Sequence, residues 1–128
     1  MNVPENLRYS KTHEWVRLEG DTALIGITEF AQSYLGDIVF IDLVVEVGDT
    51  LKAEDPFGEV EAVKAVSPLY MPIAGTVIEI NANVIAMPGI INQDPFGAGW
   101  ILKVKLVDHD NNPNLLDSPT YERTVREH

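Results

Sequence analysis

Short apolar runs separated by turn residues make up most of the chain, and many of them are rich in β-branched side chains. Runs of this kind at spacings of about eight to twelve residues are typical of an all-β sandwich or barrel. We therefore expect strands over residues 13–18, 23–27, 38–43, 57–63, 66–71, 75–81 and 100–106, and a turn at Gly48-Asp49 within residues 46–51. The strands over 57–63 and 66–71 form a core hairpin over residues 57–71, with Lys64 and Ala65 at its turn.

A short helix is predicted near residues 28–35. Thr28 is a suitable N-cap, because its hydroxyl can accept a hydrogen bond from a backbone N–H of the first turn. Gly36 is a suitable end, because glycine readily adopts the left-handed conformation that closes many helices. The large apolar side chains between these two residues fall near one helical face, which supports the prediction.

The last third of the chain is less regular. Residues 84–99 are expected to form no helix or strand, because proline, glycine and asparagine interrupt them. A C-terminal helical extension is expected over residues 110–128, with helical patterns at 113–116 and again from Ser118 onward. Pro119 suits the first turn of that second helix, because its missing N–H would be unpaired there in any case.

Length and charge limit the classes of protein that the chain can belong to. Its 128 residues predict a single domain, 1–128, and 45% hydrophobic residues with a mean hydropathy near zero are typical of soluble globular proteins. The apolar runs are too short to cross a membrane, and no signal or transit peptide is visible, so we expect a cytoplasmic, prokaryotic protein. A net charge of −11 excludes nucleic-acid binding and favours a monomer.

Few residues suggest catalysis or metal binding. The absence of cysteine excludes disulfides, thiolate nucleophiles and cysteine zinc sites. No nucleophile elbow, phosphate loop, dinucleotide fingerprint or histidine pair at metal spacing is present, so we expect no catalytic residue and no metal site. His13 and Glu14 would point to opposite faces of a strand, which favours structural roles. His109 and His128 lie in polar or terminal contexts and are expected to be solvated.

Lys64 is the most unusual residue of the pattern. It is the only basic residue between Lys52 and Lys103, and its neighbours Val63 and Ala65 are apolar. A hairpin tip holds an amine in water, whereas a Schiff-base lysine needs burial that lowers its pKa. The position therefore suits covalent modification of the amine, although by pattern alone an ordinary surface lysine explains it equally well.

The surroundings of Lys64 carry a family resemblance. Glu61-Ala62-Val63-Lys64-Ala65, followed by Leu69, Pro72 and Gly75, resembles the attachment hairpin of lipoyl and biotinyl domains. Biotin carriers usually have methionine on both sides of the lysine, so Val63 and Ala65 favour the lipoyl type. Further motifs resemble the glycine cleavage system H protein family: Leu7-Arg8-Tyr9-Ser10, His13-Glu14-Trp15, Ile25-Gly26-Ile27-Thr28, Ala31-Gln32, Leu35-Gly36-Asp37, Val39-Phe40, Pro88-Gly89, Ile91-Asn92, Pro95-Phe96 and Gly99-Trp100.

The resemblance implies a carrier rather than an enzyme, with lipoate joined covalently to Lys64. It implies a mainly β fold, a lipoyl/biotinyl-type β sandwich or flattened, hammerhead-like barrel, with the short helix and helical tail described above. Glu61 would be read by the lipoylating enzyme, a lipoate ligase or a lipoyl or octanoyl transferase. Glu14 and Thr12 would belong to the cleft that receives the loaded arm, where a carboxylate favours a bound ammonium.

The resemblance also implies a set of partners. A pyridoxal-phosphate glycine decarboxylase would load the aminomethyl group of glycine onto the arm, and a tetrahydrofolate-dependent aminomethyltransferase would unload it. A dihydrolipoamide dehydrogenase would then reoxidise the arm. Two alternatives stay open at this point. One is a lipoyl relay or donor for other lipoate-dependent complexes, and the other is an unmodified β-sandwich binding module in which Lys64 is inert.

Overall fold

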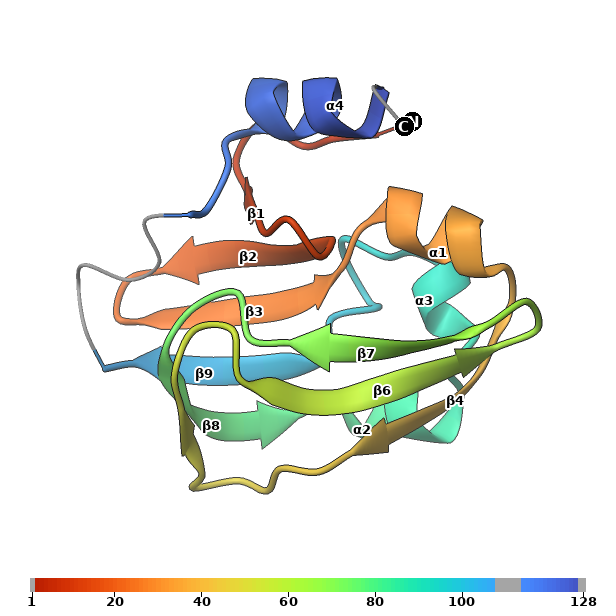
Figure 1. Cartoon of the computed structure of the whole chain (residues 1–128). Helices are drawn as coiled ribbons and strands as arrows, with labels where there is room; N and C mark the ends of the chain where they lie inside the picture. The colour runs from red at the N-terminus through yellow and green to blue at the C-terminus, as the bar shows by residue number, and fades with distance from the viewer. Residues whose placement is uncertain (1, 108–113, 127–128) are drawn as a thin grey trace.

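The computed structural model describes residues 2–107 and 114–126 of the chain (Figure 1). Its elements follow in this order: β1 (Arg8–Tyr9), β2 (Glu14–Glu19), β3 (Thr22–Ile27), α1 (Glu29–Leu35), β4 (Ile38–Leu43), β5 (Thr50–Leu51), β6 (Pro56–Ala62), β7 (Val66–Tyr70), β8 (Gly75–Ile80), α2 (Ala82–Ala86), α3 (Ile90–Gln93), β9 (Leu102–Leu106) and α4 (Ser118–Arg126).

The strands form two antiparallel sheets. One is six-stranded, in the order β1-β2-β3-β9-β8-β5, and the other is three-stranded, in the order β4-β6-β7. A single core cluster contains fully buried residues of both sheets, such as Ile25 and Val104 from the first and Val60 from the second. The sheets therefore pack face to face, and the expectation of a mainly β sandwich is confirmed.

The hairpin of β6 and β7 carries Lys64 at its turn, as the sequence predicts. Glu61 pairs with Val66, and the N–H of Ala62 donates to the carbonyl of Ala65 at 2.9 Å, which closes the turn. Strand β6 also pairs with β4 on its other side, so it is the central strand of the smaller sheet. A central strand is held by hydrogen bonds along both edges, which makes the base of the turn rigid.

Helix α1 starts and ends as predicted. Thr28 is its N-cap, and the Thr28 side chain accepts a hydrogen bond from the N–H of Ala31. Gly36 follows with φ +82°, in the region that only glycine adopts without strain. The prediction that residues 84–99 are irregular is wrong for α3, and α2 begins just before that segment. Both helices span at most five residues, too few to show a helical period in the sequence.

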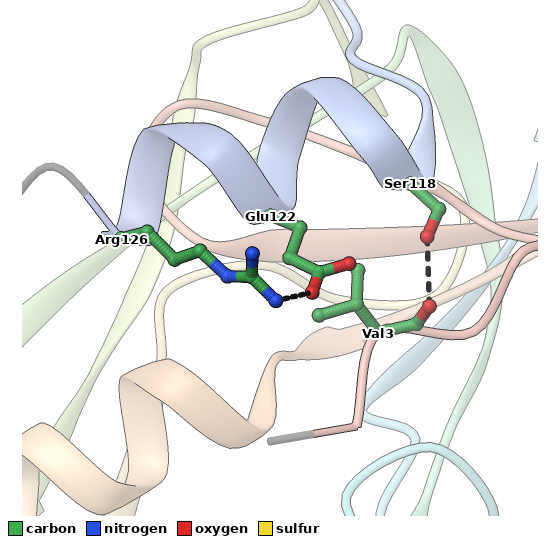
Figure 2. Close-up of polar contacts among 4 residues, drawn as sticks. All are labelled: Val3, Ser118, Glu122 and Arg126. Atoms are coloured by element: carbon green, nitrogen blue, oxygen red, sulfur yellow. Dashed lines mark hydrogen bonds and ion pairs between the residues drawn. The ribbon is translucent and has the colours of Figure 1, made fainter.

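The C-terminal helix α4 packs on the start of the chain. The predicted helical turn at 113–116 is wrong for the described residues, because Leu116 instead forms a β-bridge with Tyr9. At the start of α4, Ser118 donates a hydrogen bond of 2.7 Å to the Val3 carbonyl, and Figure 2 shows this contact beside an ion pair within the helix. Residues 108–113, 127 and 128, which include His109, His128 and part of the expected extension, lie outside the described residues.

Gly58 allows β6 to approach β4 closely, which generates a test of the smaller sheet. A Cβ at this position would overlap the Asp42 carbonyl oxygen and lie 3.0 Å from the Leu43 Cα, both backbone atoms that cannot rotate away. We expect Gly58→Ala to lower the free energy of unfolding by about 2 kcal/mol, measured by urea denaturation. Gly89→Ala is the matched control, since nothing lies within 4 Å of its added Cβ. Equal stability of the two variants would contradict this packing.

Candidate functional site

The turn that carries Lys64 is hydrogen-bonded to the last residue of α1 and to the loop that follows it. The N–H of Val63 donates to the Asp37 carbonyl at 2.9 Å, and the N–H of Lys64 donates to the Leu35 carbonyl at 3.2 Å. Hairpin tips without such contacts are among the more mobile parts of a protein. Here the backbone at the lysine is held by these two hydrogen bonds as well as by the pairing of β6 with β7.

The Lys64 side chain lies over Gly36 before it reaches solvent. A Cβ on Gly36 would be 3.5 Å from three of the Lys64 side-chain carbons, so the aliphatic stem covers that glycine. The lysine as a whole is exposed. Within residues 2–107 and 114–126, no carboxylate forms an ion pair with its amine. The amine is therefore accessible, and the backbone that carries it is held in place by hydrogen bonds.

Asn92 of α3 completes this support, and the sequence did not identify it as a site residue. Its side-chain amide donates to the carbonyl of Gly36 at 3.0 Å and to the side chain of Gln32 at 2.8 Å. Its side-chain oxygen accepts from the N–H of Ile38 at 2.9 Å. One side chain thus joins the end of α1 to the start of β4, directly beneath the lysine turn. The only signal for Asn92 in the sequence was its place in the motif Ile91-Asn92, one of those that carry the family resemblance.

Glu14 is a buried carboxylate with several donors. It is 1% exposed, and it accepts hydrogen bonds from the hydroxyls of Ser10, at 2.7 Å, and Thr12. The backbone N–H of Tyr70 donates to its other oxygen at 3.3 Å. Burial raises the Glu14 pKa to about 7, and these hydrogen bonds oppose the shift. The carboxyl group can therefore exist in either protonation state near neutral pH.

Two clefts have walls formed by residues 10–13 together with residues of other elements. The α1 cleft, of about 600 Å³, is lined by Thr12, His13, Phe30, Ala31, Tyr34, Leu35 and Ser67. The Ser10 cleft, of about 400 Å³, is lined by Ser10, Lys11, Thr12, Glu54, Tyr70, Met71 and Asn114.

Thr12 lines both clefts, and Leu35, which accepts the hydrogen bond from Lys64, lines the first. The α1 cleft therefore has in its wall both a residue that supports the lysine turn and a residue whose hydroxyl donates to Glu14. The apolar part of this cleft, around Phe30 and Tyr34, would exclude water from a chain lying in it.

The structure brings together two of the four site residues expected from the sequence. Thr12 lines both clefts and its hydroxyl donates to Glu14, whereas Lys64 and Glu61 lie on the hairpin of β6 and β7. Ser67 lines the α1 cleft and pairs with Val60, so these two side chains share one face of the smaller sheet. Glu61 follows Val60 along the strand, and its side chain therefore points to the opposite face.

His13 and Glu14 contact different residues: His13 contacts Tyr121 and Phe30, whereas Glu14 contacts Ser10 and Thr12. The predicted strand alternation is not the reason, because β2 begins at Glu14 and His13 has φ +73°.

Other kinds of site are not found in the described part of the chain. There, no group of three or more histidine, cysteine, aspartate or glutamate residues could hold a metal ion. No helix among the same residues is long and apolar enough to cross a membrane.

Comparisons with known proteins agree on one family. A family model described as glycine cleavage H-protein matches residues 7–128. Glycine cleavage system H proteins from Symbiobacterium thermophilum and Halothermothrix orenii are 51% and 46% identical to the chain, over 98% and 99% of it and 98% of each relative. The crystal structure of a glycine cleavage system H protein from Mycobacterium marinum superposes with a TM-score of 0.89 at 35% identity, covering 97% of this chain and 99% of that one.

The buried Glu14 generates a prediction about stability and pH. Its pKa rises from about 4.5 in the unfolded chain to about 7 in the folded protein, so its stabilising contribution is complete below the first value and is lost as pH rises through the second. The unfolding free energy of wild type minus that of Glu14→Gln should fall over this range by up to about 3 kcal/mol. Urea denaturation of both proteins at several pH values measures it. A difference independent of pH would contradict the raised pKa.

Proposed function

The chain belongs to the glycine cleavage H-protein family, whose members are lipoyl carriers and not enzymes, and we propose that it carries lipoate on Lys64. The observation that supports this most directly is the exposed Lys64 amine on a backbone held by the Leu35 and Asp37 carbonyls. An enzyme that attaches a group needs an accessible amine, and a carrier needs that group to start from a fixed point.

The surroundings of Lys64 fit this prosthetic group. Lipoate in amide linkage would supply a dithiolane at the end of a long, neutral chain that can accept and hand on a small group. The protein provides the fixed root of that chain, and a tether of this length keeps the carried group at high effective concentration near each partner site. The stem already lies over Gly36, beside the opening of the α1 cleft at Leu35.

Thr12 and Glu14 are proposed to receive the loaded end of the arm. The carried aminomethyl group has an amine, which is cationic near neutral pH. A cation beside Glu14 favours the carboxylate and would lower its raised pKa. The apolar walls formed by Phe30, Tyr34 and Leu35 would exclude water from the arm. Shelter of this kind preserves a group that water would otherwise remove.

The proposed partners are the three enzymes of glycine cleavage named above, together with the enzyme that attaches lipoate. We propose that each of these enzymes binds this chain as an acidic monomer in the cytoplasm. The net charge of −11 favours partners with basic contact surfaces and disfavours self-association. Glu61 is proposed as a residue that the attaching enzyme reads. It lies three residues before Lys64, on the face of the smaller sheet opposite to that of Ser67.

Attachment at Lys64 is tested by the intact mass of protein purified from its native host, followed by peptide mapping. We expect a single lipoyl increment on the peptide that contains Lys64. We expect none in Lys64→Arg, because arginine keeps the charge but cannot form this amide. Lys52→Arg is the matched control and should be modified fully. Unmodified wild type, in cells whose other lipoyl proteins are modified, would refute the proposal in favour of a binding module.

The role of Glu61 is tested by the rate of lipoylation in vitro. Loss of one charged contact to the attaching enzyme should slow modification of Glu61→Gln by about tenfold, the effect of roughly 1.4 kcal/mol. Glu59→Gln is the matched control, because Glu59 lies two residues earlier on the same face of β6 and is similarly half-buried. Equal rates for the two variants would remove Glu61 from the recognition surface.

A further inference from the structure

Tyr121 lies on α4, and its hydroxyl contacts one residue that lines the α1 cleft and the N-cap of the helix beside it. The oxygen is 2.9 Å from His13 Nδ1 and 2.7 Å from Thr28 Oγ1. His13 lines the cleft, and Thr28 is the N-cap of the helix that presents Phe30 and Tyr34 to it. A single buried hydroxyl therefore joins the C-terminal helix to two of the segments that form this cleft.

The His13 ring depends on side-chain contacts for its orientation. Its backbone has φ +73°, a conformation that residues other than glycine adopt infrequently. The His13 carbonyl already accepts from the N–H of Thr28 at 3.0 Å, so the two backbones are joined without Tyr121. The ring itself packs against Phe30, with centroids 4.8 Å apart, and edge-on to Tyr121 at 5.7 Å. The separate effect of the hydroxyl is thus on the direction of the ring.

The Tyr121 hydroxyl keeps its proton near neutral pH. Tyr121 is 1% exposed, and burial raises its pKa to about 12. With one proton and two neighbours, it donates to one of them and accepts from the other. Thr28 Oγ1 also accepts from the N–H of Ala31 at 3.2 Å. The position of the proton on the His13 ring is therefore coupled through Tyr121 to the cap of α1.

We propose that Tyr121 is a positioning residue for the α1 cleft: its hydroxyl fixes the His13 ring against the start of α1, so that the C-terminal helix sets the shape of the cleft. The proposal rests on the proposed function only in taking this cleft as the shelter of the loaded arm. It assigns to α4 a role in holding the carried group, in addition to its packing on the start of the chain.

The test compares Tyr121→Phe with Tyr9→Phe. The two rings stack on one another with centroids 4.6 Å apart, and both are fully buried. The Tyr9 hydroxyl donates to the Pro4 carbonyl, on the N-terminal segment. Each variant removes one buried hydroxyl from the same aromatic cluster, and only the first removes a partner of His13.

The first readout is the ¹⁵N spectrum of the His13 ring in protein without lipoate. Tyr121→Phe should shift the Nδ1 resonance and change the proportion of the two ring tautomers, whereas Tyr9→Phe should leave both as in wild type. The second readout is the release of ammonia from the loaded protein incubated without partner enzymes. Water consumed in this release restores the arm thiol and yields formaldehyde with the ammonia. We expect release about fivefold faster in Tyr121→Phe, the effect of one hydrogen bond.

The outcomes separate this proposal from the proposed function. An unchanged His13 spectrum in Tyr121→Phe would overturn it, and so would equal acceleration of ammonia release in both variants, which is the result of lost stability alone. A changed spectrum with release at the wild-type rate would also overturn the role in the cleft, while lipoylation of Lys64 would still stand. If wild-type Lys64 carries no lipoate in its host, the proposed function fails, and loading in vitro still decides the role of Tyr121.

Discussion

Two backbone hydrogen bonds, from Val63 and Lys64 to the loop after α1, are the constraint on which the proposed carrier depends. They join the turn of the central hairpin to the end of α1, where Gly36 has a positive φ and its carbonyl accepts a hydrogen bond from the Asn92 side chain. Because the turn is held by its strands and by this loop, motion of an attached group would come from the arm rather than from its root. A carrier that visits several enzymes benefits from this division, since each partner meets the same rigid surface.

The second feature of the molecule is the carboxyl group of Glu14, which lies in the protein interior, where ionisation is unfavourable. Glu14 is buried, and hydroxyls and a backbone N–H supply its hydrogen bonds; among the residues that the structure describes, no positively charged side chain forms an ion pair with it. A lysine or arginine beside it would lower its pKa and would compete with a cationic cargo. The raised pKa is the physical consequence of burial, which the hydroxyls and the N–H offset only in part.

Helix α4 and the first residues of the chain form a smaller aromatic cluster beside the clefts. Tyr9 and Tyr121 stack within it, and the same cluster buries Trp15 next to Glu14 on β2. The ends of the chain thus support β2, which carries Glu14, and the segment before it, which contributes polar residues to the clefts. The bridge between Tyr9 and Leu116 replaces the helix expected there, because pairing with β1 offers that segment backbone partners from outside its own sequence.

The sequence by itself determined the alternating strands, the hairpin with an isolated lysine at its turn, and α1 with its two caps. Each of these follows from neighbouring residues, through side-chain alternation, capping or glycine geometry. Only the tertiary structure decided that Leu35 and Asn92 support the lysine turn, that Thr12 lines two clefts, and that Tyr121 contacts His13. These contacts join residues up to 108 positions apart. No local pattern encodes them, because they arise only when the two sheets and α4 pack together.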